Sequence, residues 1–331
     1  MTAFQSKEFL PDTVIARLIE TRVKDPERPI QAARSRRRRE RLTPDGRLNI
    51  LAADHPARRV TGLGDDPLGM ADRQDYLARI ARVLSSDAVD GVMATMDVID
   101  DLLILHDLTR PAGGPALLDE KLLIASLNRG GLAGAAWEMD DPMTGANPES
   151  CMAYGLDGVK ILLRLCDDEP SSLRTLVAAS KAINETNALK LPLFLEPLPV
   201  TRAADGYKVV KTAEALARTV GVASALGDSS RYMWLKLPYC EDFEVVARAT
   251  MLPILLLGGE ATGDPTALLR EIAAGLAAGG NVRGAMAGRN MLYPGLEDPL
   301  VVAEAVGGII HLRWKIEHAL DAVAAASGQD L

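Results

Sequence analysis

The feature that most constrains the fold is a series of short apolar runs that recurs along the chain from residue 48 onward. Each run is nearly continuous in hydrophobic residues, which is typical of parallel strands that are covered on both faces. The intervals between the runs are long enough to hold crossover helices. The eight runs are residues 48–53, 90–95, 122–127, 158–163, 191–196, 232–237, 253–257 and 283–287.

The intervals have helical periodicity, and this combination predicts a (β/α)8 TIM barrel. Residues 73–84 place apolar side chains at amphipathic spacing, residues 171–184 follow a serine-rich start, and residues 265–278 are rich in alanine. A doubly wound open sheet is the rival fold, but no GxGxxG follows the first run, and evenly recurring units favour a closed barrel.

We therefore expect an α/β protein with the barrel in residues 48–331 and an N-terminal helical extension in residues 1–47. One or two helices of this extension should cover the bottom of the barrel or form a subunit contact. The extension contains an arginine-rich run, residues 34–41. This run predicts a solvated helix face or ion pairs with acidic residues of a neighbouring subunit, in keeping with a homo-oligomer; an anion or nucleic-acid site is the alternative.

Charge and composition exclude several classes of protein. The chain has 37 Lys+Arg against 45 Asp+Glu, a net charge of −8, which argues against a nucleic-acid partner. Hydrophobic residues make up 48% of the chain, enough to offset chain entropy, so intrinsic disorder is excluded. Because no apolar stretch has the length of a signal peptide or membrane span, we expect a cytoplasmic protein without a membrane partner.

The three cysteines, Cys151, Cys166 and Cys240, are too few and too scattered for a disulfide framework or a zinc site. We interpret them as reduced thiols in the core. The four histidines, at positions 55, 106, 311 and 318, also lack ligand spacing, so the sequence predicts no metal.

Reactive groups of a barrel enzyme stand at the C-terminal ends of the strands, and charged residues cluster there in this chain. Asp54 ends the first run, Glu196 ends the fifth, and Lys160 and Lys236 lie within the fourth and sixth. A buried ion pair with Glu196 is the structural interpretation of Lys236. The functional interpretation is an amine whose pKa is lowered by desolvation and by the charge of Lys160, which leaves a neutral nucleophile.

Glycines follow the last two runs. Gly258 and Gly259 come after the seventh run, and Gly288 and Arg289 come after the eighth. Backbone N–H groups that no side chain obstructs, together with a guanidinium, suit a phosphate, and this location is the recurrent phosphate site of such barrels. Each glycine could otherwise serve only a tight turn.

These motifs resemble the class I, Schiff-base-forming aldolases, a group that includes deoxyribose-phosphate, archaeal-type fructose-bisphosphate and tagatose-bisphosphate aldolases. The resemblance rests on Val159-Lys160, on FLE at 194–196, on Leu235-Lys236 and on AGR at 287–289. It implies that Lys236 forms the imine, that Glu196 is the acid/base, that Asp54 is the first-strand carboxylate and that Arg289 binds phosphate. Lys160 would lower the pKa of Lys236.

The expected activity is therefore the cleavage or formation of a C–C bond in a phosphorylated sugar or keto-sugar acid, with dihydroxyacetone phosphate as donor and no cofactor. We expect the pKa of Glu196 to be raised toward neutrality by an apolar barrel mouth. Three alternatives remain open: an aldolase of inositol breakdown acting on a phosphorylated deoxy-keto-gluconate, a non-covalent decarboxylase or epimerase, and a silent barrel that binds a sugar phosphate.

Overall fold

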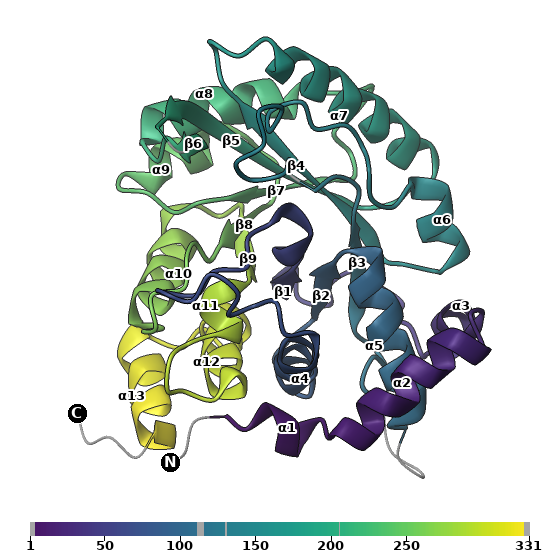
Figure 1. Cartoon of the computed structure of the whole chain (residues 1–331). Coiled ribbons are helices and arrows are strands. Elements are labelled where there is room, and N and C mark those ends of the chain that lie inside the picture. The colour runs from purple at the N-terminus through teal and green to yellow at the C-terminus, as the bar shows by residue number, and fades with distance from the viewer. Residues whose placement is uncertain (1–3, 111–115, 130, 205, 328–331) are drawn as a thin grey trace.

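The computed structural model describes residues 4–110, 116–129, 131–204 and 206–327, and it confirms the predicted (β/α)8 barrel (Figure 1). Parallel strands pair in the order β4-β3-β2-β1-β9-β8-β7-β5, and pairing of β4 with β5 closes the barrel. The barrel strands are β1 (Leu48–Ala53), β2 (Gly91–Ala94), β3 (Leu122–Ser126), β4 (Gly158–Leu165), β5 (Leu193–Ala203), β7 (Met233–Leu237), β8 (Ile254–Leu257) and β9 (Val282–Ala287).

Helices surround the strands. Each predicted helix is present. Residues 73–84 form α4, and residues 171–184 form the first part of a longer α7. Of the predicted residues 265–278, all but the first belong to α10. The helices around the barrel are α4 (Arg73–Leu84), α5 (Met96–Leu108), α6 (Pro148–Ala153), α7 (Ser171–Ala188), α8 (Ala213–Ser224), α9 (Phe243–Arg248), α10 (Thr266–Ala278), α11 (Arg289–Leu292), α12 (Pro299–His311) and α13 (Ile316–Ser327).

Two strands continue beyond the predicted runs at the C-terminal rim. β4 and β5 stay paired as far as Leu165 and Pro199, and β5 then turns back into an antiparallel partner, β6 (Gly206–Val209). A small apolar cluster fills the space between these extensions: Met139, Leu162, Cys166, Leu198 and Val200. The sequence analysis missed this hairpin, which adds a wall on one side of the mouth.

Side chains fill the interior of the barrel below the mouth. Alternate residues of the strands point inward, because successive side chains of a strand face opposite sides. The inward set includes Ile50, Met93, Ile124, Phe194 and Met286, all fully buried. The three cysteines are buried free thiols, as predicted. None of the helices in the described ranges is long and apolar enough to cross a membrane.

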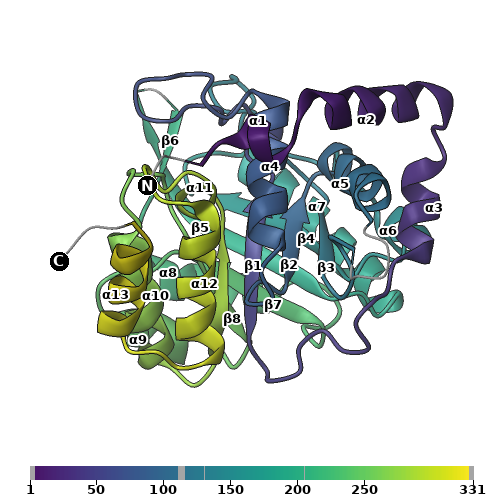
Figure 2. The same cartoon turned by 90° about the horizontal axis from the view of Figure 1, so that it is seen from below.

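The N-terminal extension forms α1 (Ser6–Phe9), α2 (Asp12–Lys24) and α3 (Arg28–Ser35). These helices lie along the outside of α4 and α5 (Figures 1 and 2), so they do not cover the bottom of the barrel, and the alternative of a subunit contact stays a prediction. The bottom is crossed instead by the segment that follows α3, which contacts residues at the starts of β2, β3 and β4.

The interpretation of the arginine-rich run was wrong for Arg36, Arg38 and Arg39, whereas Arg34, Arg37 and Arg41 are exposed. Arg36 and Arg38 both pair with Asp157, at 2.6 and 2.9 Å, and Arg39 pairs with Asp90 at 2.7 Å. These acidic residues belong to the same chain and lie at the N-terminal ends of the strands. The arginines therefore fasten the extension to the barrel, where we had expected a solvated face or pairs between subunits.

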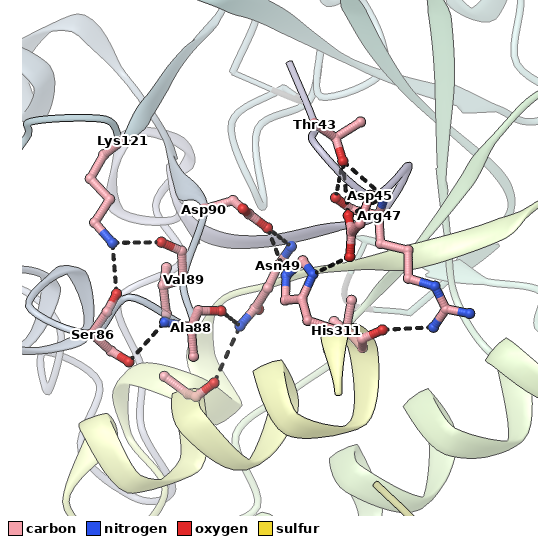
Figure 3. A network of polar contacts seen from close by, with 12 residues as sticks. Thr43, Asp45, Arg47, Asn49, Ser86, Ala88, Val89, Asp90, Lys121 and His311 are labelled. Atoms are coloured by element: carbon pink, nitrogen blue, oxygen red, sulfur yellow. Dashed lines mark hydrogen bonds and ion pairs between the residues drawn. The ribbon is translucent and has the colours of Figure 1, made fainter. Parts of the chain in front are cut away.

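A polar network closes the N-terminal end of the barrel (Figure 3). His311, at the end of α12, lies between Asp45 at 2.8 Å and Asp90 at 3.0 Å. Burial opposes protonation of His311, but hydrogen bonds to the two carboxylates raise its pKa above the ordinary value. Lys121 donates to the carbonyls of Ser86 and Val89, and its burial lowers its pKa to about 8.

Candidate active site

Four charged side chains predicted from the sequence meet in the mouth of the barrel. Nζ of Lys160 lies 2.9 Å from Oδ2 of Asp54 and 2.9 Å from Oε2 of Glu196. Nζ of Lys236 lies 3.1 Å from the same Glu196 oxygen. All four residues are buried, so the carboxylates and ammonium groups interact with little screening by water.

The strands bring these residues together through their alternation. Ile50 and Ala52 are alternate residues of β1, and Asp54, directly after the strand, continues the alternation; Phe194 and Glu196 alternate in the same way on β5. The apolar members fill the barrel interior and the charged members follow one step nearer the C-terminal end. Lys160 and Lys236 enter the same layer from β4 and β7, so the predicted proximity of the two lysines is confirmed through their common partner, Glu196.

The pKa values of the two lysines are shifted in opposite directions. Burial disfavours the charged form of Lys160, but its contacts with Asp54 and Glu196 raise its pKa above the ordinary value. Burial likewise disfavours the charge on Lys236, and the nearby Lys160 adds to this effect, so the pKa of Lys236 is lowered although Glu196 opposes the shift. Lys236 is therefore the lysine that gives up its proton more readily.

The expectation that the pKa of Glu196 is raised toward neutrality was wrong. Burial does raise the pKa of this carboxyl, as an apolar mouth should, but the charges of Lys160 and Lys236 outweigh it and lower the pKa to about 2. Asp54 behaves in the same way: burial favours its neutral form, yet Lys160 above all holds its pKa well below the usual range. Both carboxylates are ionised at neutral pH.

The predicted phosphate residues lie together after β8 and β9, but two of the glycines have packing roles. A Cβ atom at Gly288 would lie 2.4 Å from Cε1 of His55, and one at Gly258 would lie 2.9 Å from Cβ of Ala287. Gly259 differs, because its φ of +68° favours glycine and the space around its Cα is open. Arg289 begins α11 beside this turn.

Sequence reasoning missed three residues of this region. Asn290 donates to the carbonyl of Gly258 and accepts from the amide of Thr262, so it fixes the turn after β8. His55 packs against Gly288, and Arg58 ends the 3-10 turn η1 (Pro56–Arg58) that follows β1. The adjacency of His55 and Arg58 to Asp54 was the available signal for these two.

The described ranges contain no group of three or more His, Cys, Asp or Glu side chains placed to hold a metal ion. The mouth therefore presents two lysines and two carboxylates as its chemical groups, with arginine and histidine beside them. Such a set suits nucleophilic and acid/base chemistry on a carbonyl compound.

Fold and site thus define a (β/α)8 barrel with a lysine pair in its mouth. The chain belongs to the Cgl0159-like family, whose model matches residues 46–308. The crystal structure of Cgl0159 from Corynebacterium glutamicum is 37% identical, covers 92% of this chain and 99% of its own, and superposes with a TM-score of 0.85.

More distant relatives have named activities. The 2-amino-3,7-dideoxy-D-threo-hept-6-ulosonate synthase 1 of Archaeoglobus fulgidus is 22% identical over 286 residues, which are 86% of this chain and 94% of that protein. An archaeal fructose-1,6-bisphosphate aldolase, solved with its catalytic lysine covalently bound to the carbinolamine intermediate, is 21% identical with a TM-score of 0.56. That match covers 80% of this chain and 94% of the aldolase, and it shows a common fold.

Proposed function

We propose that this protein is a class I aldolase in which Lys236 forms a Schiff base with a phosphorylated ketone. The observation that carries the proposal is the asymmetry of the lysine pair: Lys160 contacts two carboxylates, whereas Lys236 contacts one carboxylate that it shares. These contacts favour the charged form of Lys160, whereas Lys236 loses its proton more readily and becomes the neutral amine. The similarity to the Archaeoglobus synthase, whose named product is a ulosonate, supports the proposal.

The reaction follows from these groups. Neutral Lys236 attacks the ketone carbon to give a carbinolamine, and loss of water gives an iminium. In the cleavage direction Glu196 takes the proton of the hydroxyl on the β carbon, two carbons from the iminium nitrogen's carbon. The bond between the α and β carbons breaks, and the β carbon leaves as an aldehyde. The electron pair of that bond moves into the iminium and forms an enamine. Protonation of the enamine and hydrolysis return the ketone and the free lysine.

The low pKa of Glu196 in the resting site is compatible with this role. Two cations lower it, and one of them is Lys236. When Lys236 loses its proton, the pKa of Glu196 rises because a positive charge disappears 3.1 Å away. The iminium restores this charge, and the charge disappears again when the enamine forms, so the pKa of Glu196 rises as the carboxylate takes up the hydroxyl proton. Asp54 keeps Lys160 charged and stands ready to orient substrate hydroxyls.

We further propose a phosphorylated substrate, with dihydroxyacetone phosphate as donor, held by Arg289 and the amide of Gly259. The support is the position of both residues after β8 and β9, beside a turn that Asn290 fixes. Removal of Arg289 should raise KM for the phosphorylated substrate far more than for its dephosphorylated analogue.

The test of the covalent mechanism is reduction with borohydride. Incubation with dihydroxyacetone phosphate and borohydride should add the mass of one reduced ketone to the intact protein, and omission of the ketone should prevent this. Turnover without any trapped adduct would favour the non-covalent decarboxylase or epimerase. Phosphate-dependent binding with neither adduct nor turnover would favour the silent barrel.

A further inference from the structure

Arg58 and Arg289 stand apart from the other arginines that are at least partly buried. Arg47 donates to the carbonyl of Ile310. Each of the remaining partly buried arginines pairs with a carboxylate, namely Arg28, Arg36, Arg39, Arg79, Arg82 and Arg164. For Arg58 and Arg289 the described residues supply no ion pair, and their buried Nε atoms have no hydrogen-bond partner. Both therefore carry unmet donors into a partly dry environment, which is unfavourable without a ligand.

Both arginines act on one histidine. His55 is buried, which lowers its pKa to about 3, and the charges of Arg58 and Arg289 contribute to the same shift. The imidazole is thus neutral, and its buried Nδ1 has no partner among the described residues. Since His55 packs against Gly288, directly before Arg289, the loop after β1 and the end of β9 share one wall of the mouth.

The charges of the mouth do not balance. Asp54 and Glu196 contact Lys160 and Lys236, whereas Arg58 and Arg289 form no ion pair within the described residues. The exposed Glu260 influences Arg289 only from a distance that forms no ion pair. The charges of these two unpaired guanidinium groups match a phosphate dianion, and guanidinium groups offer the planar donors that phosphate oxygens accept.

We propose that Arg58 and Arg289 together bind one phosphate group of the substrate, with His55 beside them as a third polar contact. This inference rests on the proposed phosphorylated substrate and adds to its recognition an arginine from the loop after β1. It also accounts for the loop after β1: η1 places Arg58 at the mouth, and the amide of Ala133 donates to the carbonyl of Arg58 and holds the turn there.

The test uses the resting protein and inorganic phosphate, with binding measured by calorimetry. Arg58→Met and Arg289→Met should each weaken binding by about 10-fold or more, the scale of one charge-assisted contact. The double variant should lose less than the product of the two single losses, because both arginines hold the same anion. Arg59→Met is the matched control, since Arg59 is exposed in the same loop and its removal takes away the same charge.

Equal effects of Arg58→Met and Arg59→Met would contradict the proposal, and so would independent losses or an absence of saturable phosphate binding. Arg58→Met should leave the melting temperature unchanged or raise it, since no protein partner is lost; a clear decrease would make Arg58 a structural residue and overturn the proposal. Phosphate bound by both arginines without a borohydride-trapped imine would refute the aldolase mechanism alone. An imine with Arg58→Met equal to its control would refute the phosphate proposal alone.

Discussion

Both ends of the barrel contain a buried lysine. The two ends differ in whether hydrogen-bond and charge partners fully compensate the buried ammonium group. At the N-terminal end Lys121 donates to two backbone carbonyls, at 2.6 and 2.7 Å. At the C-terminal end Lys236 shares one carboxylate with a second lysine, and two arginines nearby have no partner in the described chain. Burial of a lysine alone therefore does not mark a reactive site, whereas an unbalanced set of charges around it does.

The largest expected effect is on turnover, and it distinguishes Lys236 from Lys121. Lys236→Met should lower turnover by on the order of 10⁴-fold or more, because the nucleophile is lost. Lys121→Met should leave turnover nearly unchanged but lower the free energy of unfolding by about 1 to 3 kcal/mol, since two buried carbonyls lose their donor. Steady-state kinetics and urea unfolding of both variants measure this. Loss of activity in Lys121→Met, with the fold intact, would remove the distinction between the ends.

A second prediction concerns the shared carboxylate. Glu196→Gln should still form the trapped imine but lose on the order of 10²-fold or more in turnover, the scale of a general acid/base. The control is Glu138→Gln, which alters a buried glutamate that pairs with Arg164 instead of a lysine. If Glu196→Gln turns over like that control, proton transfer belongs to another group, and Asp54 is the next candidate.

The smallest expected effect is a pH dependence of stability that comes from His311 at the N-terminal end. Because the pKa of His311 is raised on folding, its contribution to stability is full below the unfolded pKa of about 6.5 and is lost as pH rises through the folded value. The wild type should therefore have a higher free energy of unfolding in urea than His311→Gln at low pH, and this difference should shrink as pH increases above neutrality. A constant difference between the two proteins across this range would show that the charge of His311 contributes nothing.

Most of the barrel could be predicted from the sequence because parallel strands that are covered on both faces need long apolar runs. The hairpin of β5 and β6 could not, since Pro197 and Pro199 are typical of a strand end. The structure shows instead that both prolines extend the pairing with β4, opposite Leu163 and Leu165. The arginine-rich run was misjudged because its acidic partners, Asp90 and Asp157, are remote in sequence.

The four charged residues of the site could be predicted because each is a charged residue within or at the end of an apolar run. The direction of the pKa shift of Glu196 could not, because it depends on the 2.9 and 3.1 Å separations from two lysines. Arg58 was missed for a similar reason: nothing in the sequence indicates that the described chain provides it with no partner.

Peptide mapping of the borohydride-reduced protein tests the central claim most directly, because it compares the buried lysines in one sample. After incubation with dihydroxyacetone phosphate, the reduced adduct should lie on Lys236, while Lys160 and Lys121 stay unmodified. The lowered pKa of Lys121 makes it a demanding control for burial without a site. An adduct on Lys160 or Lys121, or none on Lys236 despite turnover, would contradict the account.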